Sequence, residues 1–298
     1  MMAVTDSLVL SHGASGSLVG RVAALANCSR IATVGGAILA LIAATSLILP
    51  HLSPYDAFAP APTEVFQPPS AAHWFGTDIN GMDVFTRVFY GARYSFLVAI
   101  PTVLLAMLLG APAGLYAGYR GGLVDEVLMR LTDTLRIFPG IILALAIVAA
   151  LGPSLLNIIL TLGILDAAIF ARLVRAETIA LRKGGIVESA IAAGNPAWRV
   201  MWVHVFPNVQ QGLIAQTSVR AAWAVRVSAT LAFFGIGVQP PTPEWGLMIR
   251  QGGEYMLSGQ WWAGLFPGLA LLLMVLGLNF LGDGLQDILD PRRRSREG

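Results

Sequence analysis

The sequence predicts an all-α, polytopic membrane protein with six transmembrane helices, and three observations indicate this fold class. Of the 298 residues, 56% are hydrophobic and only 12% are charged. The mean hydropathy is +0.70, and the charged share is far below the roughly 25% of a soluble domain. Uncharged runs recur along the chain, and the longest allow a helix to cross the roughly 30 Å hydrocarbon core of a bilayer.

Composition also excludes several functions. The net charge of +2 argues against a nucleic-acid partner. Cys28 is the only cysteine, which excludes a disulfide within the chain and a cysteine-based metal cluster. The four histidines stand far apart in the sequence, without the spacing of metal ligands. The phosphate-binding pattern G-x-x-x-x-G-K-S/T does not occur, so we expect no cofactor in this chain, and any ATP would bind to another chain.

The first part of the chain predicts a tail, a helix and an extended segment. Residues 1–29 are rich in Ser, Gly and Ala, which is typical of a flexible cytoplasmic tail. Residues 31–50 carry no charge and predict a first membrane helix about 30 Å long. Residues 51–75 are rich in proline and aromatic residues, and 76–93 form an amphipathic approach to the next span. Residues 30–93 are therefore expected to hold the first helix and an extracytoplasmic segment.

Residues 94–283 predict a core of five further helices. The uncharged run 94–119 is the second span. The uncharged run 137–151 is too short to cross a bilayer by itself, so we expect the third helix to begin near Asp125. The remaining expected elements are a fourth span to about 174, a fifth at about 209–237, a sixth at about 262–281 and a cytoplasmic C-terminal tail at 284–298.

The distribution of basic residues predicts the orientation. Residues 172–204 contain five Lys or Arg, and residues 292–296 contain four Arg. The segments 51–93 and 238–261, on the opposite side, contain two and one. Because cytoplasmic segments carry the excess of basic residues, both termini and the segment 184–208 are predicted to be cytoplasmic.

The segment 184–208 is a polar interruption with a helical pattern in an otherwise apolar chain. Glu188 places a negative charge near the start of a short helix, and the small residues Ser189 and Ala190 allow a partner surface to approach closely. Gly194 ends the first helical stretch, and Pro207 precedes the next apolar run. The spacing alone leaves two interpretations open: a short helix that contacts a partner, or a solvated loop.

Four other stretches resemble one family of permeases. They are G-T-D-I-N-G-M-D-V-F-T-R-V-F-Y-G-A-R-Y-S before the second span, A-R-L-V-R before residue 184, G-V-Q-P-P-T-P-E-W-G-L-M between the fifth and sixth spans, and L-N-F-L-G-D-G-L-Q-D-I-L-D-P near the end. From about residue 30 to 294 the chain is identified as similar to the C-type permeases of the dipeptide/oligopeptide/nickel ABC importers. The segment 184–208 resembles their E-A-A…G…L-P coupling loop, although Ser189 replaces the usual alanine.

The resemblance implies a type I ABC importer permease fold and a non-catalytic transport subunit in a bacterial inner membrane. The implied partners are a homologous second permease, two ABC ATPase subunits that bind ATP and Mg, and an extracytoplasmic solute-binding protein. The implied cargo is a peptide or a similar small solute, with nickel complexes as an alternative. A stand-alone secondary transporter remains the alternative from a different class. A membrane enzyme is disfavoured because the sequence presents no catalytic constellation.

Three residues depart from the family pattern inside predicted spans. Asp166 and Arg226 are charged where apolar or small residues are usual, and Ser228 stands where the family often has Glu. Counting from the outer turns places Asp166 and Arg226 at similar depth. We expect both to flank the translocation path, either paired with each other or in contact with a charged solute; the alternative is an ion pair at the interface with the second permease. Arg220 is expected to extend toward the cytoplasmic surface.

The outer loop between the last two predicted spans contains Glu244 and Trp245. One interpretation makes these residues part of the docking surface for the binding protein. The other is a loop that packs on the permease itself, stiffened by its prolines, and the sequence favours this second interpretation.

Overall fold

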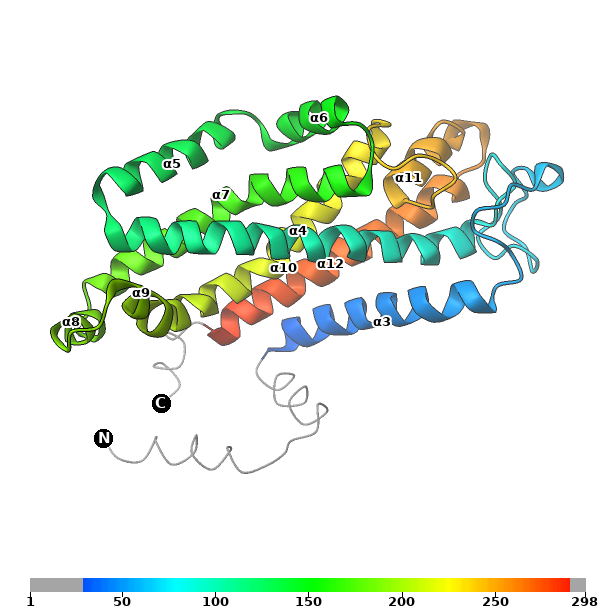
Figure 1. Cartoon of the computed structure of the whole chain (residues 1–298). Coiled ribbons are helices and arrows are strands. Elements are labelled where there is room, and N and C mark those ends of the chain that lie inside the picture. Colours follow the sequence, from blue (N-terminus) through cyan, green and yellow to red (C-terminus); the bar gives the residue numbers. More distant parts are fainter. Residues whose placement is uncertain (1–28, 290–298) are drawn as a thin grey trace.

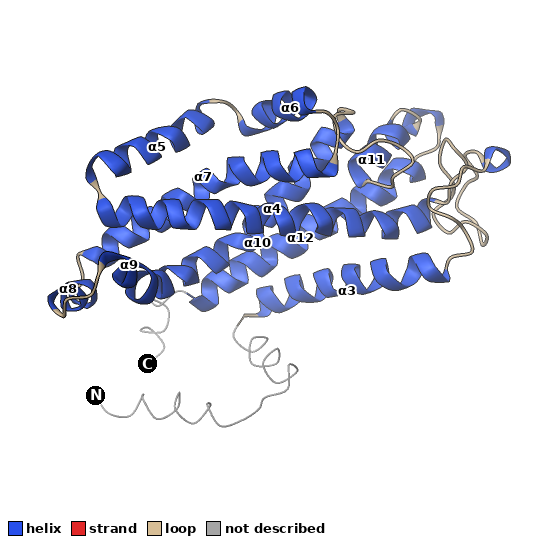
Figure 2. Cartoon of the chain, viewed as in Figure 1, coloured by secondary structure: helices blue, strands red, loops and turns tan. Residues whose placement is uncertain are grey.

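The structure is a computed structural model that describes residues 29–289. Over this range the chain forms helices and loops, and no strand occurs among the described residues (Figure 2). The predictions for residues 1–28 and 290–298, which cover most of the two tails, lie outside the described residues.

The long helices lie lengthwise beside one another (Figure 1). The short helix α8 lies at one end of this bundle, whereas α11 and the loop 53–83 lie toward the other end (Figure 1). The helices are α3 (Arg30–Leu52), α4 (Val84–Arg120), α5 (Gly122–Ile137), α6 (Gly140–Leu151), α7 (Leu155–Arg182), α8 (Gly185–Ala192), α9 (Ala197–Arg199), α10 (Phe206–Phe233), α11 (Trp245–Gly253) and α12 (Trp262–Leu289).

Helix α4 is longer than the second predicted span. Asp83 caps its start by accepting the backbone N–H of Thr86 at 2.8 Å. The helix then continues for 37 residues, so the predicted division at 93/94 falls inside it. At about 1.5 Å per residue α4 is about 55 Å long, which exceeds the hydrocarbon core of a bilayer. Residues 84–93 of the predicted amphipathic approach are therefore the first part of the helix, whereas 76–83 precede it.

Helices α4 and α7 pack against each other along much of their length, and glycines on α4 make this possible. A Cβ atom on Gly110 would collide with the backbone of Ala167, and one on Gly114 with the backbone of Ala171. The absence of these Cβ atoms brings the two backbones into close contact and buries apolar side chains such as Phe170 between them.

The prediction of one continuous third helix from near Asp125 is wrong. The structure divides this region into α5 and α6, which meet at an angle of 87°. Phe138 adopts an extended conformation with ψ 143°, because the residue before a proline is driven out of the helical region. Pro139 therefore ends α5, and a new helix begins at Gly140.

Four of the described helices are long and apolar enough to cross a membrane, and the number rises to five if α5 and α6 count as one bent span. The four are α3, α4, α7 and α12. Helix α10 has the length of a span, with 28 residues, but its sequence contains Arg220, Arg226 and several other polar residues. The fifth predicted span, at about 209–237, thus stays a prediction, and with it the total of six spans.

Buried apolar side chains form three clusters, of which the second and third share one stretch of α4 and the first lies further along it. The first joins Phe170 of α7 to Val187 of α8. The second surrounds Trp245 and Trp262 near the opposite end. The third includes Ile158 of α7 and further side chains of α4, α6 and α10. The first cluster joins α8 to the long helices, and the second joins α11 to them.

Candidate functional site

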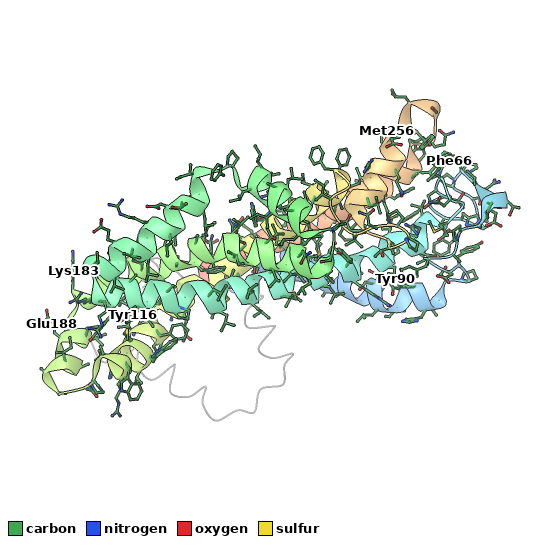
Figure 3. The ribbon with its side chains drawn as sticks, turned by 45° about the horizontal axis from the view of Figure 1, so that its top comes forward. Phe66, Tyr90, Tyr116, Lys183, Glu188 and Met256 are labelled. Atoms are coloured by element: carbon green, nitrogen blue, oxygen red, sulfur yellow. The ribbon has the colours of Figure 1, made fainter. Side chains whose placement is uncertain are left out.

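Helix α8 forms a short, projecting element at one end of the bundle. Figure 3 shows Lys183 and Glu188 at this end and Phe66 and Met256 at the opposite end. The predicted short helix that contains Glu188 and ends before Gly194 is therefore present as α8. Its proposed role as a coupling helix stays a prediction.

One side of α8 is anchored and the other is open. Val187 and Ala190 are buried in the apolar cluster shared with α7 and residues 200–205. Glu188 and Ser189 are exposed, and Ile186 and Ile191 are 60% and 51% exposed. Ala190 thus holds the helix in place and offers no surface to a partner. The exposed isoleucines, which the sequence reasoning missed, add an apolar surface around the carboxylate.

The C-terminal end of α8 is closed by its own backbone. Gly194 adopts a positive φ of 78°, a conformation that is strained for residues with a Cβ. Its N–H donates to the Ile191 carbonyl at 2.9 Å, and the Asn195 side-chain amide donates to the Ala190 carbonyl at 2.9 Å. A substitution at Gly194 would therefore strain the turn that ends α8.

The segment after α8 returns the chain to the bundle through a π-helical turn, η3 (Val200–Val205). Pro207 has no N–H and disfavours a regular helix before it, and the N–H of Phe206 bonds to the Met201 carbonyl five residues back. Trp198 and Trp202, four residues apart, are 62% and 45% exposed. The sequence contained this signal as two tryptophans at helical spacing in a polar segment.

One interpretation of the sequence paired Asp166 with Arg226, but the structure does not contain this pair. Asp166 is buried at 1% exposure on α7 and forms an ion pair with Arg220 of α10. The Arg220 guanidinium also lies over the Trp223 ring, 4.6 Å from its centre. Arg220 therefore does not extend to the cytoplasmic surface. Counting residues predicts how deep a side chain lies along a helix, but not the side of the helix from which it projects. Arg226 follows Arg220 by six residues, and at about 100° per residue it therefore projects from another side of α10.

Arg226 instead lines a cavity of about 420 Å³. Its side chain is exposed and has no ion pair among residues 29–289. Ser228 is 4% exposed and does not line this cavity. The structure thus places the three predicted pathway residues in three environments. A charged side chain within a membrane helix costs at least about 2.5–3.5 kcal/mol on insertion scales, so the predicted span at α10 would leave Arg226 in need of a partner or water.

Glu244 and Trp245 are buried, so neither offers a docking surface in this conformation. A carboxylate oxygen of Glu244 accepts the N–H of Leu247 at 2.8 Å and caps α11. The Trp245 Nε1–H donates to the Val88 carbonyl at 2.9 Å. Burial raises the pKa of Glu244, and the hydrogen bonds that its carboxylate accepts from backbone N–H groups lower it. The resulting pKa is about 7. The outer loop packs on the protein itself, which is the alternative that the sequence favoured.

Arg87 organises this outer end, and the sequence analysis missed it. Its side chain is 1% exposed, with Nε 3.4 Å from Oδ2 of Asp78. One guanidinium nitrogen donates to the carbonyls of Ala57 and Pro241 at 2.7 and 3.2 Å. Burial raises the pKa of Asp78, while the Arg87 charge and two backbone hydrogen bonds lower it. One arginine thereby joins α4 to two loops distant in the sequence.

The chain matches known proteins over most of its length. The family described as binding-protein-dependent transport system inner membrane component matches residues 110–295. The dipeptide transport system permease protein DppC of Alkalihalophilus pseudofirmus is 42% identical, over 87% of this chain and 86% of its own length. The glutathione transport system permease protein GsiD of Pectobacterium atrosepticum is 38% identical, over 89% and 88%. The probable D,D-dipeptide transport system permease protein DdpC of Escherichia coli is 37% identical, over 90% of both chains.

A solved structure supports the same fold. A chain from the MetNI methionine ABC transporter in inward-facing conformations aligns with a TM-score of 0.54 and 19% identity, over 66% of this chain and 93% of that one. At this identity the match shows the fold alone. The family match covers more than half of the chain, and its relatives exceed 30% identity over nearly all of it. The chain therefore belongs to the family of inner-membrane components of binding-protein-dependent transport systems, the permease subunits of ABC importers.

Proposed function

We propose that this permease translocates peptides, or similar small solutes, delivered by an extracytoplasmic binding protein, and that it is driven by ATPases bound at α8. The relatives named for dipeptide and D,D-dipeptide transport support peptides as cargo. The relative named for glutathione transport supports a small peptide-like solute as the second candidate. A nickel complex remains an alternative, although none of these three relatives is named for one.

The proposed assembly contains this chain, a homologous second permease, two ABC ATPase subunits and a solute-binding protein. ATP and Mg bind to the ATPases. The chain crosses the membrane six times. One of these spans is α10, although its polar residues lower its hydropathy. We place α8 and the 53–83 loop on opposite sides of the membrane, and their positions at opposite ends of the helices support this (Figure 1). The excess of basic residues in 172–204 supports a cytoplasmic location for the α8 end.

The observation that carries the coupling proposal is the two-sided character of α8. Val187 and Ala190 join it to the core cluster around α7, while Ile186, Glu188 and Ile191 remain exposed. A partner that binds the exposed side therefore displaces α8 against helices that extend into the membrane. A solvated loop without buried anchors would not transmit such a displacement.

Purification of the tagged chain from its native membrane in mild detergent tests this proposal. We expect a second permease and ATPase subunits to accompany the wild-type chain and to be lost on Glu188→Lys or Gly194→Trp. Glu254→Lys is the matched control, because it makes the same charge reversal on an exposed side chain beyond α11, with only a 3.9 Å pair to Arg250.

A different result would favour the stand-alone transporter. A chain that purifies alone, with solute flux that does not change on ATP depletion while the ion gradient is held, would refute the importer proposal. Loss of the ATPases in the Glu254→Lys control as well would show that charge reversal acts on folding and not on the α8 surface.

A further inference from the structure

The cavity beside Arg226 has a built, mixed lining. Helix α10 contributes Trp223, Arg226, Thr230 and Phe233, which recur every three or four residues and so share one side of the helix. The other walls come from α6, α11 and α12, through Ile141, Gly246, Ile249 and Leu271. The volume of about 420 Å³ lies within the range of small-molecule sites, roughly 300–1,000 Å³.

The cavity carries one uncompensated positive charge. Asp166 neutralises Arg220, the other arginine of α10, on a different side of that helix. Arg226 has no ion pair within residues 29–289, and none of the residues that line the cavity is acidic. The Arg226 side chain is exposed, so water screens its charge, and a solute that displaces this water lowers the effective dielectric constant and strengthens the attraction for an anion.

The chemistry of the lining selects the kind of anion. A guanidinium binds a carboxylate through two parallel N–H···O bonds. Trp223 and Phe233 present aromatic surface beside it, which suits an apolar group close to the carboxylate. A solute with both features, such as a short peptide with a free C-terminus and an apolar last side chain, matches the charge and the lining together.

We propose that this cavity is a solute site on the transport path, in which Arg226 binds a carboxylate and Trp223 and Phe233 contact the neighbouring apolar group. This inference rests on the proposed function, since it names the chemical class of the transported solute. The site discriminates between free carboxylates and their uncharged amides. The competing occupant is a side chain of the second permease, and the experiment below separates the two.

Cysteine labelling in the assembled complex tests the charge of the cavity. Cys28 is the only native cysteine, so Cys28→Ser gives a background in which Thr230→Cys reports on the lining one turn from Arg226. We expect an anionic methanethiosulfonate reagent to react faster, relative to a cationic one, when Arg226 is present. Arg226→Gln should lower this ratio several-fold, on the order of tenfold for a unit charge about 6 Å away in a water-filled site. Leu257→Cys, fully exposed beyond α11, is the control whose ratio should not change.

Protection by a defined solute tests the chemical class. Glycyl-leucine added to the purified complex should slow labelling of Thr230→Cys, its C-terminal amide should not, and Arg226→Gln should abolish the difference. Two results would overturn the site: a cysteine at 230 that labels in the isolated chain but not in the complex, or a reagent ratio that is indifferent to Arg226→Gln. A complex that labels as expected but takes up no peptide would refute the peptide assignment and retain the anion site.

Discussion

Replacement of Arg87 by methionine is expected to loosen the whole outer end of the protein. The methionine side chain keeps most of the apolar stem but removes the guanidinium. Asp78 then loses the cation 3.4 Å away, and the carbonyls of Ala57 and Pro241 lose their donors. Breaking a buried ion pair from one side costs about 3–5 kcal/mol, because the remaining charge stays buried without compensation.

The pH sets how much of this cost appears. Burial already raises the pKa of Asp78, and loss of Arg87 raises it further. At pH 5 Asp78 of the variant takes up a proton, and part of the loss of stability is relieved. At pH 8 folding must either bury the charged carboxylate or protonate it, and both cost free energy. Because the folded state then binds more protons than the unfolded state, stability falls as the pH rises.

Hydrogen exchange of the amides in residues 76–87 measures this local stability. At pH 8 a loss of about 3 kcal/mol corresponds to exchange about a hundredfold faster in Arg87→Met than in wild type. The double variant Asp78→Asn/Arg87→Met should recover part of the loss, because no buried charge remains. Exchange that is unchanged in Arg87→Met, or equally fast in the double variant, would refute the argument from the ion pair.

Three further predictions follow from buried groups and close contacts. The raised pKa of Glu244, about 7 against an ordinary 4.5, means that the folded state loses up to about 3 kcal/mol as the pH rises from about 4.5 to about 7. Glu244→Gln should remove this slope from the melting temperature, and a slope that persists would exclude Glu244 as its source. Asp166→Asn should destabilise by about 3–5 kcal/mol, and Asp166→Leu/Arg220→Met by less; thermal unfolding in detergent compares them, and additive losses would contradict a coupled pair. Gly114→Ala should destabilise by about 1–3 kcal/mol, whereas Gly36→Ala, where a Cβ meets nothing within 4 Å, should not; equal effects in the same unfolding assay would rule out the close α4–α7 contact as the cause.

Most of the helical architecture could be predicted from the sequence, because long uncharged runs have few alternatives in a membrane protein. The break at Pro139 was visible as a residue type, but the need for a helix long enough to cross the membrane outweighed it. In the structure α5 and α6 together have the length of a span, but they meet at a bend of 87°. Similarly, the charges Arg87 and Arg93 marked an outer segment, yet nothing in the sequence indicated that Arg87 is buried.

The local structure of the candidate site was predictable from the sequence, but its contacts between distant residues were not. The short helix around Glu188 followed from its local pattern and from Gly194, because caps and turns are local properties. The pairing of Asp166 was not predictable in this way, since it depends on how α7 and α10 are rotated against each other. Burial of Trp245 depends on a contact with Val88, 157 residues away in the sequence.

The break between α5 and α6 separates a helix without buried residues from one that belongs to the core. Helix α11 is held through Trp245 and Val88 and through the carbonyl that Arg87 reaches on Pro241. Helix α5 has no buried residue, and ion pairs of Asp125 with Arg175 and of Asp133 with Arg172 join it to α7. Because water still reaches both pairs, they weaken as ionic strength rises. Helix α6 is held by Ala144 and Val148 in the third cluster, so α5 is expected to move away from α7 first, and salt is expected to ease that movement.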